Sequence, residues 1–223
     1  LTGAIGAAGM LVAVAVGVIL SMRVSLGAEA AHRPAFTWWV VNRLAFLVGA
    51  NNLASFLLYF IQERFPELRG SAAAGPSAFL VMIVGVAILA AALPGGWLTD
   101  KFGTKPLIAV SGILATLGTA IVIAAPGIPV MYAGGILVGL GVGIFYSANW
   151  ALGTSLVPRE HAGRYLGISN LAGAGAGAIG AYIGGPIGDG AGFVVLMSIY
   201  GFLFLFSVLV LGRIKLDQPA ETL

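Results

Sequence analysis

The side chains best able to do chemistry in this sequence are a few polar residues inside long apolar runs. Arg43 follows Phe36, where one run begins, by seven residues, which places it about 10 Å into a helical span. Asn51, Ser55 and Tyr59 recur every fourth residue and so share one face of the same predicted helix. Because polar groups are costly in lipid, this face is interpreted either as a cavity lining or as an interhelical hydrogen-bonding surface.

Two asparagines lie at a similar depth on later apolar runs. Asn149 is close to the end of one run, Asn170 is near the start of the next, and Arg43 falls in the same layer. Three polar groups at one depth predict a gate or a solute-release layer, although a hydrogen bond between the two asparagines would explain two of them equally well. Arg43 has its own alternative, because it could snorkel to the membrane interface. The substrate-cavity candidates are therefore Arg43, Asn51, Ser55, Tyr59, Asn149 and Asn170.

The sequence lacks the residues needed for metal binding, thiol chemistry or acid-base catalysis. The sequence has no cysteine, and its two histidines, His32 and His161, have no partner ligands at metal-binding spacing. No carboxylate falls inside a predicted span, so an acid-base pair for an enzyme is absent as well. We expect no enzymatic activity, no metal and no cofactor. The basic residues are scattered singly, which argues against nucleic acid as a partner.

The elements that carry these residues are predicted transmembrane helices. Hydrophobic residues make up 59% of the 223 residues, charged residues only 9%, and the mean hydropathy is +1.03. Such a composition requires the lipid bilayer as solvent. Seven segments are long enough to span it, each bounded by charged residues, proline or glycine. They are 1–22, 36–62, 77–98, 107–125, 130–152, 164–187 and 192–212.

Charge asymmetry predicts the orientation of these spans. With residue 1 outside, eight basic residues fall on the inside and two, Arg64 and Arg69, on the outside. We therefore expect a cytoplasmic C-terminus. Together with the composition, this predicts an integral membrane protein, which we assign to the bacterial inner membrane.

Glycine is concentrated inside the spans, where it lets membrane helices approach closely. Gly135, Gly139 and Gly143 repeat at four-residue spacing on the fifth span. The pairs Gly173 with Gly177 and Gly180 with Gly184 do so on the sixth. We expect tight packing at these helices, either as a fixed seam or as a surface that slides during a conformational cycle.

A short loop motif lies between the third and fourth spans, where the sequence runs from Gly95 to Lys105. Within it, a glycine can permit a close helix contact, an aspartate can meet a helix terminus or a cation, and a second glycine can allow a tight reversal. This pattern predicts a charged conformational latch; the alternative is a solvated turn. The latch residues are Gly96, Asp100, Lys101, Gly103 and Lys105.

The motif resembles the loop signature of the major facilitator superfamily, Gly-x-Leu-x-Asp-Arg/Lys-x-Gly-Arg/Lys-Arg/Lys, with Thr104 where a basic residue is usual. The stretch from Trp150 to Gly167 resembles the corresponding later loop. The chain as a whole is most similar to the sugar-cation symporter branch, whose members carry Asp at the positions of Asn149 and Ser155. The absence of both acids argues against carboxylate-based proton coupling in this part.

The resemblance implies an all-α, major facilitator-type helical bundle that is a fragment of a larger transporter. Residues 1–22 would be the last helix of a missing N-terminal half, 23–35 a cytoplasmic linker, 36–212 a six-helix half-domain made of two inverted three-helix repeats, and 213–223 a cytoplasmic tail. The implied function is secondary active (symporter) or facilitative transport of a small organic solute by alternating access. A non-transporting membrane scaffold or assembly factor with the same fold is the alternative. Because an arginine at the centre of a membrane helix costs about 2.5–3.5 kcal/mol, we also expect the Arg43 guanidinium to point toward the missing half rather than into lipid.

Overall fold

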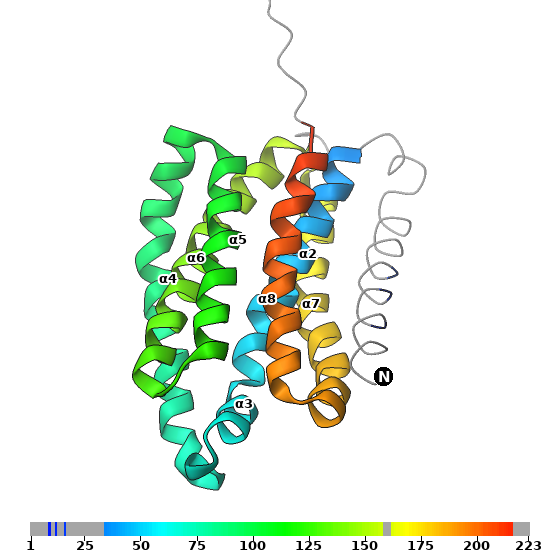
Figure 1. Cartoon of the computed structure of the whole chain (residues 1–223). Helices are drawn as coiled ribbons and strands as arrows, with labels where there is room; N and C mark the ends of the chain where they lie inside the picture. The colour runs from blue at the N-terminus through cyan, green and yellow to red at the C-terminus, as the bar shows by residue number, and fades with distance from the viewer. Residues whose placement is uncertain (1–8, 10–11, 13–15, 17–33, 158–161, 216–223) are drawn as a thin grey trace, which may run out of the picture.

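The computed structural model describes residues 9, 12, 16, 34–157 and 162–215 of the chain (Figure 1). The predicted first span, residues 1–22, lies outside the described residues except at those three positions. Most of the predicted linker, 23–35, and of the predicted tail, 213–223, also lies outside them. Every regular element in the described part is helical, as expected where lipid leaves the backbone no other hydrogen-bonding partner. The long helices are α2 (Pro34–Ser55), α4 (Ala74–Phe102), α5 (Thr104–Ala124), α6 (Ile128–Ser155), α7 (Ala162–Ala191) and α8 (Phe193–Val210). The short ones are α3 (Leu57–Arg64), η2 (Pro66–Leu68), η3 (Gly70–Ala73) and η5 (Leu211–Arg213).

These helices agree closely with the predicted spans. Among the described residues, the segments Gly70–Phe102, Thr104–Ala124, Ile128–Ser155 and Phe193–Arg213 are long and apolar enough to cross a membrane, and α2 with α3 passes as one bent span. With 30 residues α7 is long enough, but its many glycines and alanines give it a weaker apolar signal. Glycine makes two of the reversals, because Gly103 and Gly192 have φ of +89° and +92°, a region that other residues rarely adopt.

One helix departs from the prediction. The span predicted at 36–62 is broken near Phe56, where α2 and α3 meet at 59°. No proline or glycine lies at this break. Tyr59 therefore belongs to α3, so the prediction of one continuous helical face from Asn51 to Tyr59 is wrong beyond Ser55.

The helices pack as two sets of three. In one set α6 lies against α4 and α5; in the other α2 lies against α7 and α8; and α5 joins α8 across the middle (Figure 1). If α2-α4-α5 and α6-α7-α8 are taken as repeats, the first helix of each packs on the second and third helices of the other. This reciprocity is what two inverted repeats would produce.

Glycines set the close contacts of α6, as the four-residue spacing predicted. A Cβ added at Gly139 would lie 2.6 Å from the Val84 oxygen, and one at Gly143 would lie 2.9 Å from the Ala91 Cβ, both on α4. The neighbouring Gly134 faces α5 instead, where a Cβ would lie 2.7 Å from the Gly118 oxygen. Helix α6 thus has glycine contacts on two sides. On α7 tight packing holds at Gly180 and Gly184, whereas Gly173 and Gly177 have room for a side chain.

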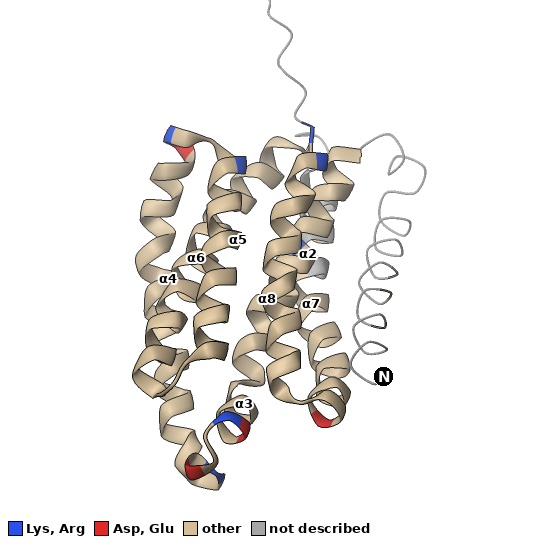
Figure 2. Cartoon of the chain, in the orientation of Figure 1, with Lys and Arg blue, Asp and Glu red and all other residues tan. Residues whose placement is uncertain are grey.

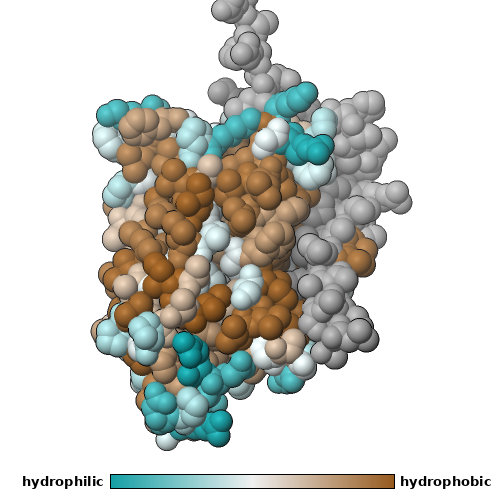
Figure 3. Space-filling model, viewed as in Figure 1, coloured by the Kyte–Doolittle hydropathy of each residue, from teal (hydrophilic) through white to brown (hydrophobic). Residues whose placement is uncertain are grey.

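The surface has the distribution of an integral membrane protein. Apolar residues cover most of the middle of the visible face, with polar residues at both ends (Figure 3). The charged residues coloured in the cartoon of Figure 2 also gather at the two ends of the bundle. One end has Lys101, Lys105, Arg213 and Lys215 with Asp100, and the other has Arg64 and Arg69 with Glu63, Glu67 and Asp189. The first end is the more basic one, which is the predicted cytoplasmic side.

Candidate functional site

The structure brings Arg43 and Asn149 together, as their equal depth suggested. The Nη1 group of Arg43 on α2 donates a hydrogen bond of 2.9 Å to the Oδ1 atom of Asn149 on α6. Both residues are buried, with 7% of Arg43 and 0% of Asn149 exposed. The guanidinium therefore points into the bundle and does not snorkel along the lipid surface.

The hydrogen bonds continue from Asn149 in a single direction. Asn149 Nδ2 donates to Asn42 Oδ1 at 2.9 Å, and Asn42 Nδ2 donates to the Ser207 main-chain oxygen on α8 at 2.7 Å. The indole Nε1 of Trp39 donates to the Asn149 main-chain oxygen at 3.0 Å. Both amide side chains have donors and acceptors satisfied, so the polar chain is compatible with full burial. It links α2, α6 and α8 at one depth; we refer to Trp39, Asn42, Arg43 and Asn149 as the Arg43 cluster.

Aromatic rings border this cluster. The Arg43 Cζ atom lies 5.8 Å from the Trp39 ring centroid and 5.9 Å from that of Trp150. These distances are within the range of cation–π attraction. Trp39 is fully buried, whereas Trp150 is 42% exposed and Tyr146, one turn earlier on α6, is 40% exposed. The cluster thus adjoins an open surface of α6.

Asn51 and Ser55 lie on an exposed face of α2, while their neighbour Asn52 turns inward. Ser55 Oγ donates to its own helix at the Asn51 oxygen, 3.1 Å away. Asn52 is 1% exposed and donates to the Ala176 oxygen of α7 at 3.1 Å. Tyr59 is 51% exposed and stacks on Phe193, with ring centroids 5.4 Å apart. The Asn51 and Ser55 side chains are exposed, and Tyr59 belongs to an aromatic contact at the far end of the bundle.

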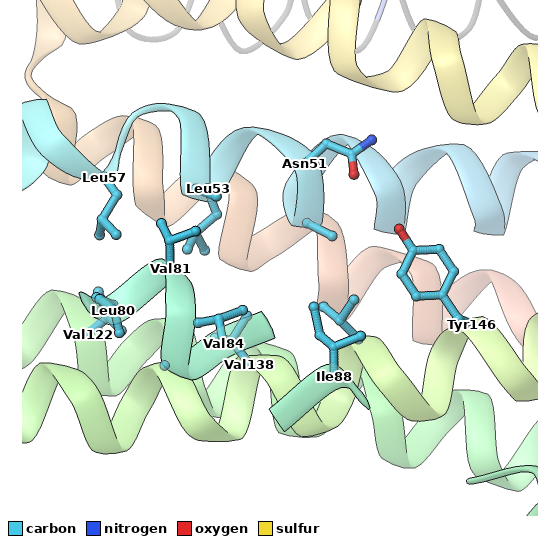
Figure 4. Close-up of a pocket in the computed structure, with 14 residues that line it drawn as sticks. Asn51, Leu53, Leu57, Leu80, Val81, Val84, Ile88, Val122, Val138 and Tyr146 are labelled. Atoms are coloured by element: carbon cyan, nitrogen blue, oxygen red, sulfur yellow. The ribbon is translucent and has the colours of Figure 1, made fainter. Parts of the chain in front are cut away.

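A small cavity of about 100 Å³ lies beside this face, between α2 and the set of α4, α5 and α6 (Figure 4). Its walls are mostly aliphatic side chains, among them Leu53, Leu80, Val84 and Val138. Asn51 and Tyr146 are the polar residues that line it; in Figure 4 the Tyr146 hydroxyl is directed toward α2, whereas the Asn51 amide is directed away from the aliphatic wall, toward α7. The cavity therefore combines an apolar wall with a hydroxyl group, and the Asn51 amide lies at its margin.

Asn170 does not join the layer that its depth predicted. It is exposed on α7, whereas Asn149 makes its asparagine contact with Asn42. The alternative explanation, a hydrogen bond between Asn149 and Asn170, is therefore wrong. The direction in which α7 presents Asn170 depends on the packing of this helix against α2 and α8.

The latch motif forms the α4–α5 reversal. Gly103 at φ +89° ends α4, and its N–H donates to the Thr99 oxygen at 2.8 Å. Lys105 Nζ donates to the Ile214 oxygen beyond η5, so this loop holds the end of the last helix. Lys101 is exposed and lies 5.1 Å from the Trp97 ring centroid. Asp100 is also exposed.

The close helix contact expected at Gly96 occurs one residue earlier. A Cβ at Gly95 would lie 3.2 Å from the Ile144 Cα on α6, whereas one at Gly96 would meet nothing within 4 Å among the described residues. The prediction placed the motif at the right turn. It chose the wrong glycine for the contact with α6, Gly96 instead of Gly95.

Sequence reasoning missed three residues of the site, Trp39, Asn42 and Tyr146. Asn42 was not considered because Arg43, the next residue, is the charged one. Its partner on α8 is a main-chain oxygen, which a sequence pattern does not reveal. Tyr146 could have been found, because it lies one helical turn before Trp150 on the same face of the fifth span. Among the described residues, no group of three His, Cys, Asp or Glu side chains could hold a metal ion.

Comparisons with known proteins agree with this architecture. The model of the family described as Major Facilitator Superfamily matches residues 75–222. The minor myo-inositol transporter IolF of Bacillus subtilis is 27% identical over 128 residues, which are 57% of this chain and 29% of that protein. Inositol transporter 4 of Arabidopsis thaliana is 35% identical over 112 residues, 47% of this chain and 19% of that protein. Myo-inositol transporter 3A of Cryptococcus neoformans is 29% identical over 143 residues, 60% of this chain and 23% of that protein. The chain spans less than a third of the length of each of these relatives.

Proposed function

The chain belongs to the Major Facilitator Superfamily, and from this membership we propose that it is part of a transporter that carries a small organic solute across the membrane by alternating access. The observation that carries the proposal is the open face of α2 and α6, where the exposed residues Asn51 and Tyr146 line the cavity. In an otherwise apolar bundle, a polar face of this kind suits contact with a hydrophilic solute.

The domain arrangement is part of the same proposal. Residues 36–212 form one six-helix half, which rocks against a second half that precedes it in the full-length protein. Residues 1–22 belong to that preceding half, 23–35 link the two, and 213–223 form a tail on the cytoplasmic side. The basic end of the bundle, with Lys101 and Lys105, supports this orientation in a bacterial inner membrane.

We further propose that the solute is an uncharged polyol of the inositol class. Two observations support this choice: the three relatives compared above have names of inositol transporters, and the polar residues that line the cavity, Asn51 and Tyr146, are uncharged. Such groups donate and accept hydrogen bonds from hydroxyls without needing a charge. The aliphatic wall would meet the C–H face of a ring.

Uptake of labelled myo-inositol by vesicles that contain the full-length protein tests the proposal. Tyr146→Phe removes one hydroxyl, and Tyr132→Phe is its control because Tyr132 packs edge-on against Phe79 away from the cavity. Losing one neutral hydrogen bond costs about 0.5–1.5 kcal/mol, so we expect KM to rise about twofold to tenfold in Tyr146→Phe. The control should match the wild type.

Two results would count against this function. If wild-type vesicles take up no polyol and no other small solute, the scaffold alternative, which family membership does not favour, would regain support. Equal kinetics in Tyr146→Phe and Tyr132→Phe would remove the cavity from the transport path. A dependence of uptake on a proton or sodium gradient distinguishes symport from facilitated diffusion.

A further inference from the structure

The cavity beside α2 has two unlike ends, which lie at opposite sides of Figure 4. Tyr146 lies at one end with its hydroxyl directed toward α2, and the Asn51 amide lies at the margin of that end. Leu57, Leu80 and Val122 line the other end. None of the described residues that line the cavity is charged. A bound molecule therefore meets a hydroxyl at one end and only hydrocarbon at the other.

The apolar end has a closed floor and an open mouth. Leu57, Leu80 and Val122 are buried, so the floor is part of the core of the bundle. Ala54 on α2 and Val81 on α4 also line the cavity, and both are exposed. The cavity is thus accessible from the surface between these two helices.

The two ends select different chemical groups. A hydroxyl beside Leu80 would lose its hydrogen bonds to water without replacement, which is unfavourable. A methylene group at the same place gains from leaving water, by about fourfold in affinity for each group fully buried. The hydroxyls of a polyol therefore belong near Tyr146 or outside the cavity, and the apolar end suits a hydrocarbon substituent.

The volume limits the size of that substituent. An apolar cavity of about 150 Å³ with aliphatic and aromatic walls is large enough for benzene, which has six carbons. The cavity here measures about 100 Å³ in all, and Tyr146 and Asn51 occupy one end of its lining. The remaining apolar end has room for a chain of about three carbons.

We propose that the transported solute is a polyol with one short alkyl substituent, such as an O-alkyl ether, and that the alkyl group enters the apolar end of the cavity. The residues Leu57, Leu80 and Val122 then determine specificity, because they separate substituted from unsubstituted polyols. The inference rests on the proposed function, since it refines the class of solute that the same cavity binds.

A series of myo-inositol ethers tests the inference in vesicles that contain the full-length protein. Methyl, propyl and hexyl ethers compete with labelled myo-inositol for uptake. The propyl ether should inhibit about tenfold more strongly than the methyl ether, because two more methylene groups are buried. The hexyl ether should inhibit no more strongly than the propyl ether, because the cavity is then full.

Two patterns of inhibition would overturn the inference. Equal inhibition by the methyl and propyl ethers would mean that no apolar subsite accepts the chain. Inhibition that keeps rising through the hexyl ether would indicate partition into lipid, which increases with every methylene group and has no size limit.

Substitutions at the mouth connect this preference to the cavity. Ala54→Phe and Val81→Phe narrow the mouth from opposite sides, and Ala90→Phe is the control, because Ala90 is exposed on α4 and does not line the cavity. The ratio of methyl to propyl inhibition constants should fall toward one in both mouth variants and stay near ten in the control. Because the ratio compares two ligands in one variant, differences in expression cancel. An unchanged ratio in both mouth variants would refute the assignment.

Titration calorimetry of the purified full-length protein with the same ethers separates this inference from the proposed function, because it needs no transport. If the propyl ether binds most tightly in a protein that takes up no polyol, the apolar subsite is supported and the transport function is contradicted. If myo-inositol is taken up without any preference for the propyl ether, the transport function is supported and the subsite is refuted. Absence of binding by all three ethers would also refute the subsite.

Discussion

Gly139→Ala tests whether the close approach of α4 and α6 depends on the missing side chain. The new Cβ would lie 2.6 Å from the Ala87 Cβ and 2.6 Å from the Val84 main-chain oxygen. Non-bonded carbon atoms prefer about 3.5–4.0 Å, so the two helices would have to separate by roughly 1 Å. The obstacle is backbone, which cannot rotate away as a flexible side chain could.

The size of the effect follows from two opposing contributions. Overpacking a close-packed contact costs about 1–3 kcal/mol, and replacing glycine by alanine inside a helix returns up to about 1 kcal/mol. Gly85→Ala on α4 isolates the second contribution, because a Cβ there would meet nothing within 4 Å among the described residues. The two variants should therefore differ in unfolding free energy by about 1–3 kcal/mol, with Gly139→Ala the less stable.

Thermal unfolding of the purified full-length protein, followed by tryptophan fluorescence in detergent, measures this difference. A difference of this size should appear as several degrees between the two midpoints. Equal midpoints for Gly139→Ala and Gly85→Ala would refute the reasoning, since they would mean that α4 and α6 separate at no cost.

Three further predictions concern topology, the reversal and the polar cluster. The topology is tested in a full-length protein from which any other cysteine has been removed. A cysteine introduced at Ser71 should react with a membrane-impermeant thiol reagent only from outside the cell. Labelling only from the cytoplasm would contradict the predicted topology. Gly103→Val should lower stability by about 1–3 kcal/mol in thermal unfolding, because φ is +89° there, and Gly96→Val, in a regular helix with open space, is the comparison that should stay milder. Asn42→Ala leaves Asn149 Nδ2 without its acceptor and should cost about 1–3 kcal/mol, whereas Asn51→Ala on the exposed face should leave the unfolding temperature unchanged.

The long elements were predictable because lipid imposes a simple rule. A run of about twenty apolar residues must form a helix, and the boundaries predicted at residues such as Gly103 and Gly192 agree with the structure. The break at Phe56 was not predictable, because neither proline nor glycine marks it. Its angle is set by what α2 and α3 pack against.

The position of a site residue along its helix was predictable from the sequence, whereas the side of the helix to which its side chain points was not. Arg43 and Asn149 were placed in one layer by counting residues, and they are hydrogen-bonded. Asn170 was placed in the same layer but is exposed, because the rotation of α7 about its axis follows from its neighbours. The same limit explains the shift from Gly96 to Gly95, which is one residue and about 100° around α4.

The partnership of α2 with α7 and α8 has a consequence for how the chain is made. Helices α4, α5 and α6 are consecutive, so each can meet its partner as it leaves the ribosome. The main partners of α2, the helices α7 and α8, are synthesised roughly 130 or more residues later, a delay on the order of ten seconds at usual rates of translation. Until then Asn42 lacks its acceptor on α8 and Asn52 lacks its acceptor on α7, whereas Arg43 can meet Asn149 once α6 is made. The insertion machinery must therefore shelter α2 until synthesis of this region is complete, and slow translation of residues 162–210 would prolong the period in which the nascent protein is open to proteolysis.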